Sequence, residues 1–396
     1  MDLTAESARL KTAVPSVYLD QWVWVRLTLA AGGTPREPSD TQVLGAVRRA
    51  AEAGVVFPLS ATHYHETSRI THPRQRADLA RTMASISHCR TLCSERILLR
   101  DQFLEAMHVS FGKPTFRRTP PQSLGIGAGW AFTGKRLQLQ LRRSTQVVDP
   151  ATLPEGMADG FRRATQYTEY QLLAGPQDAD LPSCVNCQLG YQPEKLEEVR
   201  RSRLGWETFY ADLLADDPIS AAELRVRVQA REIIHEHLKL LNDLCAEYRM
   251  DLPQATGVDP ERPKVSRSRM TAFVDRVPSV RVAVDVKTHR FRNAAKKWDL
   301  NTVHDIDAVS LAVPYCHAVV PDREIADLLG RSKAGPRNGT HVVRGLGDLP
   351  DLLADLTRTA AASHHRVRDE DWVRQGEGFC MTMKDLQRSG TAPTSG

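Results

Sequence analysis

The stretch NTVHDIDAVSLAVPYCHAVVPDREIADLL, Asn301–Leu329, contains in one run the elements that decide the predicted fold. Apolar residues recur at helical spacing along Val303–Val313, which predicts a helix with one buried face. Ala318–Val320 is a short apolar segment that predicts a strand, closed by a Pro-Asp pair. A second helix is expected to begin at Ile325. The run therefore indicates a helix, a strand and a helix in succession.

The same alternation is present near the N-terminus. Ser16–Leu27 begins with β-branched and aromatic residues, which predict a strand ending near Asp20. Ser60 is a plausible N-cap for a helix through Thr67. The other expected elements are helices over Asp40–Ala53, Gln75–Ser87, Ile97–Val109 and Leu349–Leu356, and strands over Val55–Leu59 and His341–Val343. This order predicts an α/β protein with three α/β/α layers and a mainly parallel central sheet.

The middle of the chain differs from both ends. Ser220–Arg249 has a long helical pattern, and Asp251–Arg267 is polar and Pro-rich like a linker. We therefore expect a mostly helical insertion with loops at residues 112–267. The α/β domain would then consist of residues 14–111 and 268–358, followed by a polar tail at 359–396.

Composition restricts the class of protein. Of the 396 residues, 41% are hydrophobic, which suffices for a sizeable core, and no apolar run approaches the length of about 20 residues that a membrane helix needs. The opening MDLTAESARLKTAVPS lacks the apolar core of a signal peptide. The seven irregularly spaced cysteines do not suggest a disulfide framework. We expect a cytoplasmic protein without a membrane partner.

The formal net charge of +5 is small, but its distribution is uneven. Arg and Lys gather in Phe116–Arg143, Lys195–Arg203 and Arg262–Lys297. Such patches attract polyanions such as nucleic acids. They are also common as solvated faces, and charge alone favours this second interpretation.

Carboxylates stand at or near the ends of the predicted strands, namely Asp20, Glu66, Asp305, Asp307 and Asp322. In an open parallel sheet, groups at the carboxyl ends of the strands converge on one crevice. A dense set of acids is costly unless cations neutralise it, and Mg²⁺ or Mn²⁺ prefers carboxylate oxygens. Taken singly, each acid has an ordinary structural explanation as a turn, cap or surface residue. The hypothesis of a Mg²⁺ or Mn²⁺ site depends on their joint placement.

Four segments resemble the motifs of PIN-like domains. VYLDQWVWVRL is similar to the opening strand with its first metal-binding Asp, and FPLSATHYHETSR to the second motif with its Glu. The segment Asn301–Leu329 resembles the third and fourth motifs, and THVVRGLGDLPDLLADL the closing strand and helix. The resemblance covers roughly Val14–Val109 and Met270–Leu356. It implies the acidic set Asp20, Glu66, Asp307 and Asp322 as catalytic metal ligands, with Asp305 as an additional candidate.

The resemblance also implies an activity and partners. PIN-like proteins typically cleave RNA with Mg²⁺ or Mn²⁺ and a metal-activated water, and many are toxins or defence effectors. It implies an endoribonuclease, leaves DNA open as a substrate, and makes an inhibitory partner protein and homo-oligomers reasonable expectations. Gln21 and Pro321 depart from the family, because Ser or Thr is common at both positions. The Pro321 departure motivates an alternative, a catalytically impaired PIN-like module that binds nucleic acid or protein.

The segment HRFRNAAKKWDLN, just before the third motif, is strongly basic. Its cations predict contacts to phosphate oxygens, and Trp298 predicts base stacking. The alternative is an amphipathic connector whose Trp packs in the core. The candidate nucleic-acid-binding residues are Arg290, Arg292, Lys296 and Lys297.

Two further motifs give weaker signals. Cys184 and Cys187 form a single C-x-x-C, which lacks a clear second pair for zinc, although Cys89 and Cys93 are conceivable partners. A zinc-dependent assembly protein is therefore a third, weaker hypothesis. The glycines of Gly125–Gly129 lack the Lys-Ser/Thr of a phosphate-binding P-loop.

Overall fold

A computed structural model describes residues 9–112, 119–136, 141–143, 146–148, 152, 154–175, 193–216, 219–259, 261–293 and 296–362. The chain forms two compact units. Unit 1 comprises Met1–Asp20, Cys93–Ser123 and Gln192–Asp348, and unit 2 comprises Gln21–Leu92, Leu124–Tyr191 and Leu349–Gly396. The predicted insertion at residues 112–267 contributes to both units.

The described residues are mostly helical, and their sheets are small. One sheet has the strand order β1-β6-β7, and two further sheets have two strands each, β2-β3 and β4-β5. The predicted three-layer α/β/α fold with a mainly parallel central sheet is therefore wrong. The predicted strand at Val55–Leu59 contains only isolated bridge residues, Val56 and Leu59, the second of which pairs with Thr91. Apolar segments of this length fit a buried loop or helix as well as a strand, so periodicity alone could not separate them.

The sheet of unit 1 is parallel and buried. β1 (Val17–Leu19) pairs with β6 (Ala318–Val320), with Val17 opposite Ala318 and Leu19 opposite Val320. β7 (His341–Val342) pairs with the other edge of β6. All residues of β1 and β6 are buried, as expected for a parallel sheet covered by helices. The strands predicted to end near Asp20 and to run over Ala318–Val320 are confirmed.

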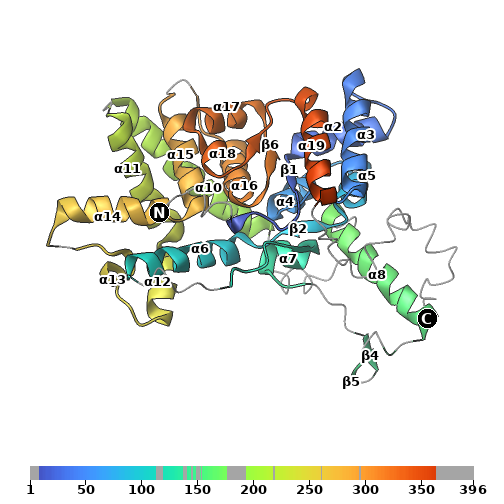
Figure 1. The fold of residues 1–396 in the computed structure, drawn as a ribbon, viewed down its shortest axis with the longest axis horizontal. Coiled ribbons are helices and arrows are strands. Elements are labelled where there is room, and N and C mark those ends of the chain that lie inside the picture. The colour runs from blue at the N-terminus through green and yellow to red at the C-terminus, as the bar shows by residue number, and fades with distance from the viewer. Residues whose placement is uncertain are drawn as a thin grey trace. The chain divides into compact units, whose positions relative to one another are not determined.

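The centre of unit 1 is the helix α15 (Pro278–Phe291), which lies among helices on several sides (Figure 1). The helices that pack against it are α11 (Ala221–Arg231), α14 (Pro263–Asp275), α16 (Leu300–Tyr315), α17 (Arg323–Ser332) and α18 (Ala334–Arg337). Nearly every residue of α15 is buried, including Arg281, Asp285, Lys287 and Arg290. Charged groups are buried at low cost only when they are paired, and each of these four has a polar partner.

The predicted long helix at Ser220–Arg249 is interrupted. α11 begins after Ser220, whose hydroxyl accepts from Glu223 N at 3.2 Å, as its capping sequence predicts. A π-helical segment, Glu232–His237, follows, and α12 (Leu238–Glu247) completes the run. The predicted linker instead holds α13 (Leu252–Thr256) and α14. The other long helices of unit 1 are α6 (Glu95–Ser110) and α10 (Pro193–Asp216).

The end of α16 contains Pro314, which lacks the N–H that a helix interior requires. Lys11 stabilises this end, because its Nζ donates to the carbonyl oxygens of Val313 (2.9 Å) and Cys316 (2.6 Å). The same ammonium donates to Thr340 Oγ1 at 2.6 Å. One lysine thus connects the N-terminal segment of unit 1, the last turn of α16 and the approach to β7.

Unit 2 is also built mainly from helices. Its helices are α2 (Gln21–Ala31), α3 (Pro38–Glu52), α4 (Ala61–Ser68), α5 (Pro73–Ser87), α7 (Gly127–Thr133), α8 (Glu155–Ala174) and α19 (Leu349–Ala362). Its strands are β2 (Arg90–Leu92), β3 (Leu124–Ile126), β4 (Leu141–Arg143) and β5 (Gln146–Val148). The buried carboxylate of Asp40 on α3 receives two guanidinium nitrogens of Arg26 on α2, at 3.1 and 2.5 Å. This pair fixes the two helices together.

The glycine-rich run at Gly125–Gly129 has a structural explanation in unit 2. Gly127 has φ +81°, and a Cβ there would lie 2.2 Å from Glu169 Oε1. The Glu169 carboxylate accepts from Ala128 N at 2.9 Å. The glycine therefore admits a buried carboxylate of α8 to the start of α7, which is consistent with the missing P-loop signature. Among the described helices, none combines the length and apolar character needed to cross a bilayer.

Candidate acidic site

Asp20 and Asp322 follow two neighbouring strands of unit 1. Leu19 and Val320 are paired at the carboxyl ends of β1 and β6, and Asp20 N donates to Val320 O at 3.2 Å. Asp322 comes two residues after Val320, beyond the buried Pro321. Both aspartates are half-buried. The carboxyl ends of parallel neighbours meet at one edge, so these two acids leave the sheet on the same side.

Asp322 has a structural task as well. It is the N-cap of α17, and its Oδ1 accepts from Ile325 N at 2.6 Å. An N-cap aspartate also places its charge at the positive end of the helix dipole. The structural explanation of this acid is thus correct, and it does not exclude a ligand at the remaining carboxylate oxygen.

Asp307 lies on α16 and is held by an arginine that the sequence analysis did not single out. Arg203 of α10 donates from Nη1 to Asp307 Oδ2 and from Nη2 to Oδ1, both at 2.8 Å. Burial alone would raise the pKa of Asp307, but the Arg203 charge and hydrogen bonds outweigh it and lower the pKa. Both carboxylate oxygens are therefore engaged by a cation from the chain itself.

The Arg203–Asp307 pair belongs to a larger set of buried or half-buried charges in unit 1, which we call the ion network. Arg203 Nε lies 2.7 Å from Glu236 Oε2, and Lys287 Nζ lies 2.7 Å from Glu207 Oε1. Lys287 also contacts Glu232, and Arg231 Nη2 lies 2.5 Å from Glu207 Oε2. Its cations are Arg200, Arg203, Arg231 and Lys287, and its carboxylates are Glu207, Glu232, Glu236 and Asp307.

The ion network has four cations and four carboxylates, and the neighbouring Glu95 adds an acid whose pKa is raised by burial and by Asp307. Lys287 shows how the field acts, because its burial would lower the pKa and the Glu232 and Glu207 carboxylates instead raise it. Clustered acids need cations, and at Asp307 the guanidinium groups of Arg203 and Arg200 supply that charge. The signal that could have found this is the charged spacing of α10, where Arg200, Arg203 and Glu207 recur three and four residues apart.

The two remaining predicted acids are Asp305, in unit 1, and Glu66, in unit 2. Asp305 is half-buried on α16, two residues before Asp307. Glu66 is half-buried on α4 in unit 2, where the neighbouring Thr67 Oγ1 accepts from Gln21 Nε2 at 3.1 Å. The membership of Glu66 in the acidic set therefore stays a prediction. Within unit 1, Glu197 of α10 and His304 of α16 offer ligand atoms within 4.8 Å of each other, which the sequence analysis also missed.

The predicted phosphate contacts divide into two kinds. The Arg290 side chain is only 4% exposed, forms an ion pair with Glu324, and donates to Lys297 O at 2.5 Å. Lys296 Nζ lies 2.9 Å from the same Glu324. Lys296, Arg292 and Lys297 are all exposed, and of these three only Lys296 forms an ion pair among the described residues. Arg290 therefore stabilises the connection between α15 and α17, and only exposed cations are free to meet a ligand.

Trp298 is buried, and its ring centroid lies 4.8 Å from that of Phe291. The interpretation of this Trp as a core residue is the one observed. Cys89, Cys93, Cys245 and Cys316 are free and buried. The C-x-x-C pair Cys184 and Cys187 lies outside the described residues, so the zinc hypothesis stays a prediction.

Comparison of this chain with known proteins finds no relative. The PIN-like resemblance of the four segments therefore stays a prediction that rests on their residues alone. Neither models of protein families, nor curated proteins, nor solved structures give a match to this chain.

Proposed function

We propose that the chain is a metal-dependent nuclease that hydrolyses phosphodiester bonds, with RNA as the expected substrate. The observation that carries the proposal is the adjacency of Asp20 and Asp322 at the carboxyl ends of the paired strands β1 and β6. Asp305 on α16, which packs against β6, is the additional acid of the same unit. The PIN-like resemblance of the surrounding segments supports the same assignment.

The donor set fits a hard divalent cation. Asp20 and Asp322 are half-buried carboxylates, and Mg²⁺ and Mn²⁺ prefer such oxygens together with water. When bound, the cation would polarise the phosphodiester and activate a water. Asp20 and Asp322 would hold the cation, while the α17 cap fixes the Asp322 side chain in one orientation. Asp307 would bind the cation only if Arg203 released it, so we do not count Asp307 among the direct ligands.

Cleavage of a labelled single-stranded RNA tests the proposal. We expect cleavage with Mn²⁺ or Mg²⁺ that stops on adding EDTA. Asp20→Asn and Asp322→Asn should each slow it by on the order of 100-fold or more, equivalent to about 2.7 kcal/mol in the barrier. The matched control is Asp243→Asn, since Asp243 is an exposed acid on α12 that pairs with Lys239 four residues earlier. Equal activity in all three variants would reject the assignment.

A second candidate is a nucleic-acid-binding protein that does not cleave. The observation that favours it is the two-point engagement of Asp307 by Arg203, which leaves this predicted metal ligand without a free oxygen. RNA binding that survives EDTA and Asp20→Asn, without cleavage under any metal condition, would favour this candidate over the nuclease.

A further inference from the structure

Basic side chains gather in unit 1 where α15 and α17 end and α18 lies. We call this group the basic face, and its members are His289, Arg292, Arg331, Lys333 and Arg337. The four Arg and Lys residues are exposed, and His289 is half-buried. The face differs from the predicted basic segment His289–Asn301, with which it shares only His289 and Arg292.

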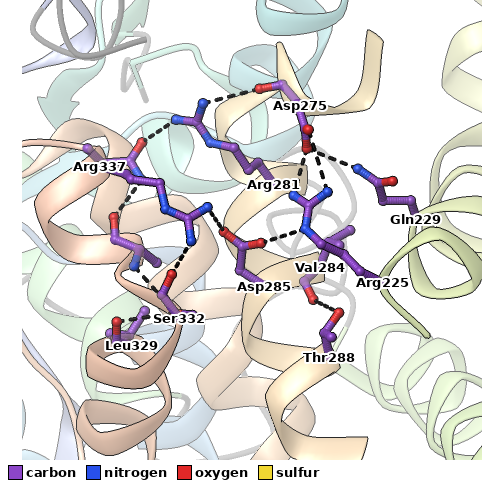
Figure 2. Close-up of polar contacts among 12 residues, drawn as sticks. Arg225, Gln229, Asp275, Arg281, Val284, Asp285, Thr288, Leu329, Ser332 and Arg337 are labelled. Atoms are coloured by element: carbon purple, nitrogen blue, oxygen red, sulfur yellow. Dashed lines mark hydrogen bonds and ion pairs between the residues drawn. The ribbon is translucent and has the colours of Figure 1, made fainter. Parts of the chain in front are cut away.

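Two contacts of Arg337 connect the helices of the basic face (Figure 2). Its Nη1 donates to Asp285 Oδ2 of α15 at 3.0 Å, and its Nη2 donates to the carbonyl oxygen of Ser332, the last residue of α17. Asp285, His289 and Arg292 are four and three residues apart, so they follow one side of α15. Arg331 and Lys333 flank Ser332 in the chain. Arg292, Arg331 and Arg337 all lie close enough to His289 to act on its charge, so these four residues share one region, and Lys333 follows Ser332 at its border.

The acids near this region are already committed. Asp285 Oδ1 lies 3.1 Å from Arg225 Nε while Oδ2 receives Arg337, so one carboxylate is shared by two guanidinium groups (Figure 2). Arg225 is held in turn by Asp275, at 2.7 Å. In the part of the chain that the structure describes, no ion pair involves Arg292 or Arg331. Asp327, four residues before Arg331 on α17, lies 3.7 Å from Arg344. Arg292 and Arg331 thus carry positive charge that no ion pair among the described residues neutralises.

His289 reports this excess charge. Burial lowers its pKa, and the neighbouring Arg292, Arg331 and Arg337 lower it further against the opposing effect of Asp285. Cations near helix C-termini also compensate the helix dipole, and Arg337 does so at the end of α17. Arg292 and Arg331 add charge beyond that requirement, so an anionic ligand would relieve the repulsion among these residues.

We propose that the basic face binds the phosphate backbone of single-stranded RNA. The choice of RNA rests on the proposed function, and the chemistry rests on the guanidinium groups, whose planar donors match phosphate oxygens. Exposed Arg292 and Arg331 make the contacts, and Arg337, oriented by Asp285, supports them. Arg290 and Lys296 do not take part, because Glu324 engages both. With Trp298 buried, the contacts are to the backbone rather than to bases, and binding is independent of sequence.

The test measures RNA binding by fluorescence anisotropy in EDTA, so that cleavage does not interfere. The variant is Arg292→Gln with Arg331→Gln in the full chain. The control is Arg201→Gln with Lys239→Gln, whose side chains are 71% and 85% exposed elsewhere in unit 1. We expect the variant alone to weaken binding. For the variant, the slope of log K against log salt concentration should decrease in magnitude by about 1.4, because each phosphate contact on a single strand contributes about 0.7 and two contacts are removed.

The outcomes separate this inference from the nuclease proposal. Unchanged RNA binding in the variant overturns the inference, even if the chain cleaves RNA. An equal loss in the control also overturns it, because the attraction is then spread over the surface. A loss confined to binding of phosphatidylserine vesicles overturns it in favour of a membrane ligand. A loss of RNA binding confined to the variant supports it, even if no metal condition yields cleavage.

Discussion

Arg203 and Asp307 form a two-point ion pair between α10 and α16, with both nitrogen–oxygen distances at 2.8 Å. The side chains are 19% and 13% exposed. The pair links a helix of the predicted insertion with the helix that carries the most specific motif of the chain. Because of this pair, the predicted metal ligand Asp307 belongs to the ion network. The contribution of the pair to stability can therefore be measured separately from any catalytic role of Asp307.

Arg203→Met is expected to destabilise the protein strongly. The change leaves the Asp307 and Glu236 carboxylates without their nearest cation, and removing one partner of a buried pair costs about 3–5 kcal/mol. The slight exposure of Asp307 places the expected loss near the lower end of that range. Urea unfolding followed by circular dichroism measures it.

The control is Arg227→Met, which breaks an exposed pair with Glu223 four residues earlier on α11. An exposed pair of this kind contributes little to stability, because solvent screens it. Adding Asp307→Leu to Arg203→Met should recover part of the stability, because the unpaired carboxylate is then removed as well. If Arg203→Met proved no more harmful than Arg227→Met, the ion network would not have the assigned role.

Two substitutions at Asp322 separate its capping role from its proposed metal role. Asn is as good an N-cap as Asp, so Asp322→Asn should leave thermal stability nearly unchanged, whereas Asp322→Ala should cost about 1 kcal/mol. Under the nuclease proposal, both should slow metal-dependent cleavage by on the order of 100-fold or more. Differential scanning calorimetry and the RNA cleavage assay give the two readouts. Full cleavage by the Asp322→Asn variant would show that Asp322 acts only as the N-cap of α17 and not as a metal ligand.

Single strands and helix caps could be predicted from the sequence further than the architecture could. β1, β6 and the N-cap at Ser60 follow from local patterns, because turn residues and β-branched runs act within a few positions. The extent of the sheet does not, since Val55–Leu59 is apolar but forms only isolated bridges and no strand. Burial in a loop and burial in a strand demand the same residue types.

The pairing of charges was also beyond local reasoning. Arg203 and Asp307 are 104 residues apart, and Lys287 meets Glu232 across 55 residues. The sequence shows that α10 is rich in charge but not which acid each arginine meets. For the same reason, the sequence of α15 predicts part of an exposed basic segment. In the structure its Arg281, Lys287 and Arg290 are buried and paired with groups from other elements.

His317 predicts a loss of stability in mild acid. Its Nδ1 accepts from Ser16 N at 3.2 Å, which requires that nitrogen to be unprotonated. Burial, with smaller contributions from Lys11 and His341, lowers the pKa of His317 to about 4. The unfolded chain, with a pKa near 6.5, therefore binds more protons between these values, and stability falls as the pH drops from about 6.5 to 4.

His317→Asn should flatten this part of the stability profile, because the side chain no longer titrates. The measurement is the urea midpoint of unfolding at several pH values between about 7 and 4. His72→Asn is the control, since His72 is exposed before α5, and it should keep the slope of the wild type. A slope unchanged in His317→Asn would assign the acid sensitivity to other groups.

Gly127→Ala should destabilise unit 2 more than the same change at Gly54. Both glycines have positive φ, +81° and +96°, which costs an L-residue about 1–2 kcal/mol. A Cβ at Gly54 would meet nothing within 4 Å, whereas at Gly127 it would lie 2.2 Å from Glu169 Oε1. In a Glu169→Ala background the cost of Gly127→Ala should fall to that of Gly54→Ala, as a double-mutant cycle of thermal unfolding measures. Equal costs in both backgrounds would mean that the carboxylate does not require this glycine.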